Sequence, residues 1–277
     1  VCVSPTRTGP PIPPITPHVC VSPTRTWLDG HPIGAAPPGV IEVGFGPDQR
    51  PVLAALGPDG LTLRDLRAHQ TLSFGMAVDA LTSAEGRLYA LACDRLVELA
   101  LHAVGPGLVV APRVVAHLAR HATRLYPGLV VQALRGVTFL GFFDAAGGCA
   151  MVPVPPLAGH RVVEAIGARG VAALIGERDG RYDRFLVRLD AFGQPEVQVD
   201  ADVASPAVDL CVLDTGVCVL READGALTLF PRRAGEPGRK TIAADLPAAL
   251  RLVPRGSRLG FVHGARIGWL RMRRNGG

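Results

Sequence analysis

The chain has 277 residues, of which 48% are apolar and 19% are charged, and its formal net charge is +5. This length can build one large core, or one domain with a tail. The high apolar content is typical of many short strands buried on both faces. No apolar run reaches about 18 residues, so the sequence does not predict a membrane-spanning helix.

The N-terminal 38 residues contain a duplication. The octapeptide VCVSPTRT stands at residues 1–8 and again at residues 19–26, and six prolines lie within residues 1–18. Proline-rich sequence favours an extended polyproline II segment, as in a linker that follows an upstream domain. Alternatively, Val19–Trp27 forms an outermost strand, where a proline is tolerated because the free edge needs no donor.

Six units of one kind follow in chain order. The clearest unit has apolar runs at 207–213 and 217–220, the hairpin dipeptide Asp224-Gly225, and alternating apolar residues from Leu227. Each unit therefore predicts three short antiparallel strands joined by tight turns. The units cover residues 40–66, 77–101, 130–154, 162–189, 206–232 and 249–272.

Fourth strands are expected between units, at residues 71–74, 109–115, 196–199 and 240–243. The second turns recur with a mean period of about 41 residues, within the range of four-stranded propeller blades. Residues 40–272 thus resemble a β-propeller with degenerate WD-repeat-like blades, although no unit carries the Gly-His and Trp-Asp signatures. We predict an all-β, six-bladed β-propeller, or seven blades if residues 102–129 contain another.

The last unit has no fourth strand, because the chain ends soon after its third. The resemblance to propellers implies that the other terminus supplies the missing strand. Val19, Val21 and Trp27 are therefore predicted in a closing strand, within a proline-rich arm (1–38) that precedes the propeller (39–277). The first octapeptide copy would then be a spare strand, which could add to the edge of a neighbouring molecule.

The six cysteines include Cys211 and Cys218, which face each other if residues 214–215 form a two-residue hairpin loop. That pairing leaves open a cross-strand disulfide or two buried thiols. No Cys-x-x-Cys spacing predicts structural zinc, and His117 and His121 lack a third ligand. We expect no metal, no cofactor, and reduced thiols in a cytoplasmic protein.

The C-terminal region is basic, with no acidic residue after Asp245. Such a surface would attract an acidic protein partner by electrostatics. A nucleic-acid partner is less favoured, because the aromatic residues that interleave with basic ones are limited to Phe261 and Trp269. Neither a membrane partner nor a membrane surface is expected. The predicted partner-binding residues are Arg232, Arg233, Arg266, Arg271, Arg273 and Arg274.

The sequence lacks a Gly-x-Ser-x-Gly elbow, a phosphate-binding loop and a dinucleotide fingerprint. We expect a non-enzymatic protein-interaction or sensor module, the C-terminal propeller of a larger protein or complex. Lys240 is the sole lysine among many arginines, a bias that suggests a GC-rich, bacterial coding sequence.

Two alternatives belong to other functional classes. The first is a propeller hydrolase or lyase with its active site in the central funnel. It predicts a cluster of acidic residues at the ends of inner strands, namely Glu42, Asp79, Glu164 and Asp209. The second is a structural protomer that assembles by strand exchange through Val1–Thr8.

Overall fold

A computed structural model gives the structure of most of the chain. It describes residues 2–3, 19–21, 25–28, 31–35, 40–46, 49–104, 107–201, 207–213, 218–222, 225–230, 240–243, 251–255, 258–263 and 266–271.

The described strands form seven antiparallel sheets, and each sheet is built from strands that are consecutive in the chain. The first sheet contains β1 (Cys2–Val3), β2 (Val19–Val21), β3 (Arg25–Leu28) and β4 (His31–Ala35). The second contains β5 (Val40–Phe45), β6 (Pro51–Gly57), β7 (Gly60–Asp65) and β8 (Thr71–Phe74). The third contains β9 (Ala80–Ala84), β10 (Arg87–Ala92), β11 (Arg95–Val104) and β12 (Gly107–His117).

The remaining four sheets continue in chain order. The fourth contains β13 (Thr123–Tyr126), β14 (Leu129–Leu134), β15 (Val137–Phe143) and β16 (Cys149–Pro153). The fifth contains β17 (Arg161–Ala168), β18 (Val171–Arg178), β19 (Arg181–Leu189) and β20 (Pro195–Asp200). The sixth contains β21 (Ala207–Val212), β22 (Cys218–Glu222), β23 (Leu227–Phe230) and β24 (Lys240–Ala243). The seventh contains β25 (Arg251–Arg255), β26 (Arg258–His263) and β27 (Arg266–Arg271).

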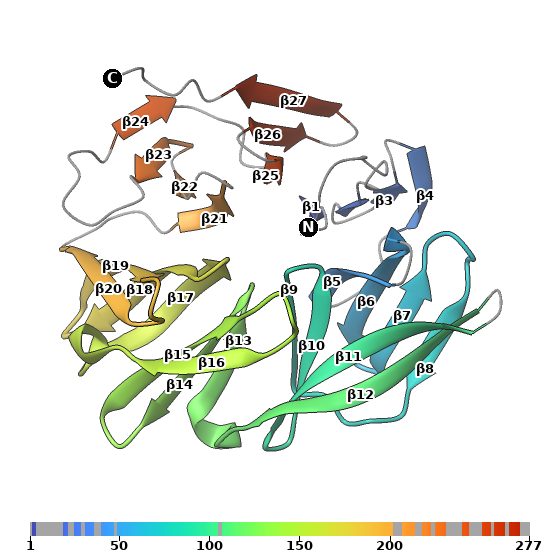
Figure 1. Cartoon of the computed structure of the whole chain (residues 1–277), viewed down its shortest axis with the longest axis horizontal. Coiled ribbons are helices and arrows are strands. Elements are labelled where there is room, and N and C mark those ends of the chain that lie inside the picture. The colour runs from blue at the N-terminus through green and yellow to red at the C-terminus, as the bar shows by residue number, and fades with distance from the viewer. Residues whose placement is uncertain are drawn as a thin grey trace.

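The sheets stand around a common centre (Figure 1). The first strand of each sheet contacts the first strand of the next, from β5 through β9, β13, β17 and β21 to β25. The strand β1 contacts both β25 and β5, so the inner strands make a closed ring. We call the contact between two neighbouring inner strands a seam.

The core consists of apolar layers between neighbouring sheets. The strand β10 shows why the sequence reads as continuous apolar runs, since Leu88 and Ala90 pack toward the second sheet while Tyr89 and Leu91 pack toward the fourth. Successive side chains of a strand point to opposite faces, so a strand buried on both faces needs apolar residues at every position.

The predicted all-β propeller class is confirmed, and the strands predicted in five units are present. The third unit is the exception, because residues 130–154 form the second to fourth strands of a sheet rather than the first to third. Its inner strand is β13, which reads TRLY. Arg124 and Tyr126 interrupt the apolar pattern there, so this strand was not predicted.

The N-terminal residues have partners other than those predicted. In the described residues, Val19–Val21 pairs with Cys2–Val3 and with Arg25–Leu28, not with a strand of the seventh sheet. The seventh sheet is thus formed without them, and they lie in a sheet of their own where six blades were expected. Prolines around both octapeptide copies obscured a Val-Cys-Val pattern that lets the two copies pair. The boundary between an arm and a propeller at residues 38 and 39 stays a prediction.

The described helices are the short 3-10 segments η2 (Arg120–Ala122) and η3 (Pro155–Leu157). In the part of the chain that the structure describes, no helix has the length and apolar character to cross a membrane.

Candidate functional site: a pocket at the centre of the ring

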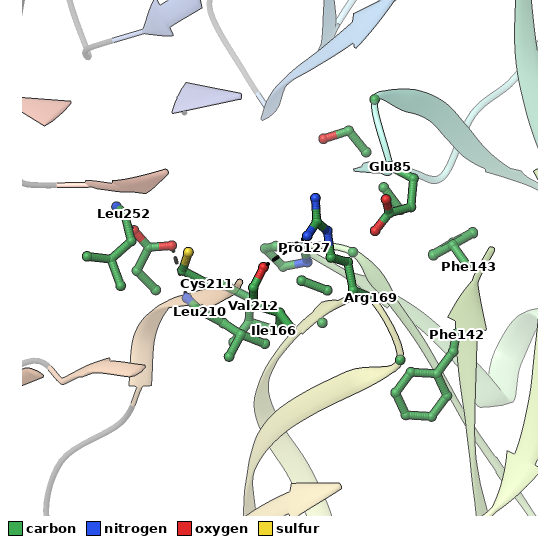
Figure 2. Close-up of a pocket in the computed structure, with 18 of the residues that line it drawn as sticks. Glu85, Pro127, Phe142, Phe143, Ile166, Arg169, Leu210, Cys211, Val212 and Leu252 are labelled. Atoms are coloured by element: carbon green, nitrogen blue, oxygen red, sulfur yellow. Dashed lines mark hydrogen bonds between the residues drawn. The ribbon is translucent and has the colours of Figure 1, made fainter. Parts of the chain in front are cut away.

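A pocket of about 240 Å³ lies where the inner strands meet (Figure 2). Its walls come from the inner strands β5, β9, β17, β21 and β25, from the hairpin turns that follow several inner strands, and from the end of β15, the third strand of the fourth sheet. Residues far apart in the sequence therefore share one cavity. The lining residues with polar side chains are Glu42, Ser83, Glu85, Arg169, Asp209 and Cys211, and those with bulky apolar side chains include Phe142, Phe143, Ile166, Leu210, Val212 and Leu252.

Glu42 is the buried acid of the pocket. It lies on β5 and is 8% exposed, and the Ser83 hydroxyl on β9 donates a hydrogen bond of 2.6 Å to its Oε2. Burial raises the pKa of Glu42 to about 7, because desolvation of the charged form outweighs the hydroxyl and amide of Ser83, which favour it. The Glu42 carboxyl is therefore about half protonated near neutral pH.

Asp209 links two neighbouring sheets. Its Oδ2 accepts a hydrogen bond of 2.7 Å from the Leu252 amide on β25, and its Oδ1 accepts one of 3.0 Å from the Leu210 amide. A register shift between Ala207 and Asp209 interrupts the ladder with β22 at this point. Because both oxygens bind backbone amides, Asp209 is fixed at the seam between β21 and β25.

Glu85 and Arg169 enter the pocket from equivalent hairpin turns. Each is the first residue of a two-residue loop that ends in glycine, Gly86 or Gly170, and all four residues have positive φ. Positive φ at both central positions is the type I′ geometry that joins antiparallel strands. Figure 2 shows the Arg169 side chain reaching the middle of the pocket, with Glu85 on one side and Val212 on the other. The Arg169 Nη1 donates to the Val212 carbonyl oxygen at 3.3 Å, across the seam between β17 and β21.

Hydrogen bonds also join the neighbouring sheets at the other seams from β5 to β17. The Phe45 amide donates to the Gly86 carbonyl oxygen at 2.6 Å. The buried Thr82 hydroxyl donates to a carbonyl oxygen of β13, that of Tyr126, at 2.8 Å and accepts from the Gly128 amide at 2.9 Å. The Gly167 amide on β17 donates to the carbonyl oxygen of Pro127 at 2.8 Å. Most polar groups of the pocket thus hold one sheet against the next.

Two of the four predicted acidic residues reach the pocket. Glu42 and Asp209 line it, whereas Asp79 forms an ion pair with Arg120 at 2.5 Å and Glu164 is exposed on β17. Sequence reasoning missed Ser83, Glu85 and Arg169. A polar residue followed by glycine between two apolar runs was the signal that could have found the last two.

The cysteine that lines the pocket is not an activated nucleophile. Burial raises the pKa of the Cys211 thiol far above its ordinary value, so the reactive thiolate is scarce. The Ser83 hydroxyl donates to the Glu42 carboxyl, and no histidine is found among the described residues that line the cavity. Throughout the described ranges, no three histidine, cysteine, aspartate or glutamate side chains gather in a way that could hold a metal ion.

The predicted facing of Cys211 and Cys218 is wrong. Cys211 is opposite Val219 and Cys218 is opposite Val212, so the two thiols are on opposite faces of the sheet, and both are free. The register differs by one residue from the one expected for a two-residue loop, and a shift of one residue moves every side chain to the other face. His117 and His121 do not share a helix face either, since His117 ends β12 and His121 lies in η2.

The predicted arginine patch lies largely outside the described residues. Arg266 and Arg271 are the first and last residues of β27, whereas Arg232, Arg233, Arg273 and Arg274 are not described. Partner binding by these six residues stays a prediction.

No family model and no curated protein matches the chain. Solved structures do. Hsv2 of Kluyveromyces lactis is 10% identical, with a TM-score of 0.53, and the match covers 94% of this chain and 90% of that one. Hsv2 of Kluyveromyces marxianus is 8% identical, with a TM-score of 0.50, covering 89% of this chain and 85% of that one. Hsv2 is a β-propeller, so these similarities support the fold, and at such low identity they carry no function.

Proposed function

We propose that this chain is a non-enzymatic sensor module of a larger bacterial protein or complex, and that its central pocket binds a small ligand. The observation that carries the proposal is the position of the pocket. The inner strands of several sheets line it, and several of its lining residues form the hydrogen bonds that join neighbouring sheets at the seams. A ligand that contacts the residues of those hydrogen bonds would alter how neighbouring sheets pack. That is the coupling that a sensor needs between a binding site and a distant surface.

The chemistry of the lining supports binding over catalysis. Asp209 and Ser83 are both engaged at seams, and the Cys211 thiol is held protonated by burial. Ligand pockets typically combine apolar walls with a few fixed polar groups, which is the composition found here.

A pocket-filling variant tests the proposal. Ala168 lines the pocket, so Ala168→Phe should block it, whereas Ala103→Phe places the same ring on the exposed end of β11 as a matched control. A library of small metabolites would be screened by thermal unfolding. A true ligand at 100 times its Kd stabilises the fold by about 2.7 kcal/mol. The shift should appear in the wild type and in the control variant and vanish in Ala168→Phe. Ligands that stabilise all three proteins equally would overturn the proposal.

A second candidate, a hydrolase or lyase, is favoured by one observation. Glu42, with its pKa of about 7, has the protonation behaviour of a general acid and shares the pocket with a second carboxylate, Asp209. This candidate predicts turnover of some ester, glycoside or polysaccharide substrate by the wild type and its loss in Glu42→Gln. Turnover that Glu42→Gln retains would remove this role for Glu42.

The partner of the sensor is proposed to be an acidic protein that binds the C-terminal arginines. Charge reversal at Arg266 and Arg271 would then weaken binding of an acidic partner, and added salt would weaken it in the wild type. Binding that is indifferent to both changes would place the partner elsewhere.

A further inference from the structure

We infer that the central pocket takes a small organic cation, an ammonium group on a short apolar body, with its charge placed against Glu42. This inference rests on the proposed function, since it names the ligand class of the same pocket. Its first support is the charge of the lining. Among the described residues that line the pocket, three carry carboxyl groups, Glu42, Glu85 and Asp209, and one carries a guanidinium, Arg169. A cation lowers this excess of negative charge and an anion would add to it.

The second support is the state of Glu42. Its hydrogen-bond partner among the described residues, Ser83, is neutral, and the carboxyl is almost fully buried. Ionising a buried carboxyl beside a neutral partner is costly, and a cation at the same place offsets that cost. The pocket therefore gains more from a positive ligand than a solvated acidic surface would.

The third support is the remainder of the wall. The cavity is also lined by the apolar side chains of Phe142, Phe143, Ile166 and Leu252. These side chains suit an apolar body. A volume of about 240 Å³ is below the roughly 300–1,000 Å³ of pockets for drug-sized ligands, so the ligand has on the order of ten non-hydrogen atoms.

A cation at Glu42 must displace the proton that the carboxyl holds near neutral pH. The Ser83 hydroxyl on β9 contacts it directly, and the other charged groups among the described residues of the pocket are Glu85 from the turn after β9, Arg169 from the turn after β17, and Asp209 on β21. With the Glu42 pKa near 7, binding should be about tenfold weaker at pH 6 than at pH 8. Close to one proton should leave per ligand bound at pH 6, and almost none above pH 8.

The test is calorimetry of the full chain with benzylammonium, benzyl alcohol and benzoate, three probes of one shape and different charge. Titrations at pH 6 and pH 8, in two buffers with different ionisation enthalpies, give both the affinity and the protons released. The expected result is at least tenfold tighter binding of benzylammonium than of the other two at pH 8, with proton release at pH 6.

Matched variants show whether the preference for the cation and the release of a proton come from Glu42. Glu42→Gln should lose the preference for the cation and show the same affinity at both pH values, with no proton release. Glu85→Gln should bind more weakly at both pH values and still release the proton. Glu177→Gln, which changes a partly exposed acid that is paired with Arg161 and does not line the pocket, should behave as the wild type does.

Each other outcome refutes the inference. Equal or tighter binding of benzoate or benzyl alcohol refutes it, and so does proton release that survives Glu42→Gln. The same holds if none of the three probes binds. The sensor proposal is judged separately, because Ala168→Phe tests occupancy of the pocket by a ligand of any charge.

Discussion

The burial of Glu42 makes a quantitative prediction about stability. The pKa rises from 4.5 to about 7 in the folded protein, and each unit corresponds to about 1.36 kcal/mol, so full ionisation of Glu42 costs the fold about 3 kcal/mol. A raised pKa means that the folded state holds its proton more tightly than the unfolded state. The cost is therefore absent below pH 4.5, grows between pH 4.5 and pH 7, and is complete above that.

Glu42→Gln removes the ionisable group and keeps the shape of the side chain. At pH 8 the variant should be more stable than the wild type by up to about 3 kcal/mol, and near pH 4.5 this advantage should have disappeared. Urea denaturation of both proteins at several pH values measures the difference, and the pH response of all other groups cancels. A difference that stays constant from pH 4.5 to pH 8, or that grows as the pH falls, would refute the assignment of a buried, proton-retaining Glu42.

Three further predictions concern the seams and the thiols. Gly128 has positive φ, and a Cβ there would lie 2.0 Å from a carbonyl oxygen of β17, so Gly128→Ala should destabilise the fold by several kcal/mol in urea denaturation, on the order of the largest single-residue effects. Gly180→Ala, at an open turn of similar φ, should cost only about 1 kcal/mol, and equal costs would contradict the close approach. Thr82→Val should cost about 2 kcal/mol in the same assay, because it leaves a partly buried amide and a partly buried carbonyl of the next sheet without their hydroxyl partner; a neutral result would show that these hydrogen bonds are dispensable. Alkylation of the native protein followed by peptide mapping should modify the exposed Cys93 and leave the buried Cys211 untouched until denaturant is added, and rapid native labelling of Cys211 would show that the pocket wall opens.

The sequence predicted the fold well where strands obey simple rules. Val171–Arg178 and its neighbours were found because turn dipeptides such as Asp179-Gly180 separate apolar runs. The rules failed at β13, whose short TRLY sequence gave no apolar run, and at the N-terminus, where prolines obscured the pairing of the two octapeptide copies. In both places the strand is specified by its neighbours more than by its own composition.

The candidate site was predicted less completely. Glu42 and Asp209 were named because a central active site would need acids at the ends of inner strands, but the same expectation also chose Asp79 and Glu164, which are not among the pocket's lining residues. Which acids reach the centre depends on the strand register and on local register shifts, such as those next to Asp209 in β21 and next to Glu164 in β17. Arg169 was missed because a residue of a hairpin turn is placed by the backbone geometry of that turn, which composition does not reveal.

The most direct test of the central claim observes the pocket wall while a ligand binds. Methyl-labelled protein would be titrated with benzylammonium at pH 8, and the methyl signals of Ile166, Leu210 and Val212 would be followed by NMR. We expect saturable shifts of these signals in the wild type and in Ala103→Phe, no shifts in Ala168→Phe, and recovery of the probe unchanged. Shifts confined to methyl groups outside the pocket, or shifts that persist in Ala168→Phe, would contradict the central claim.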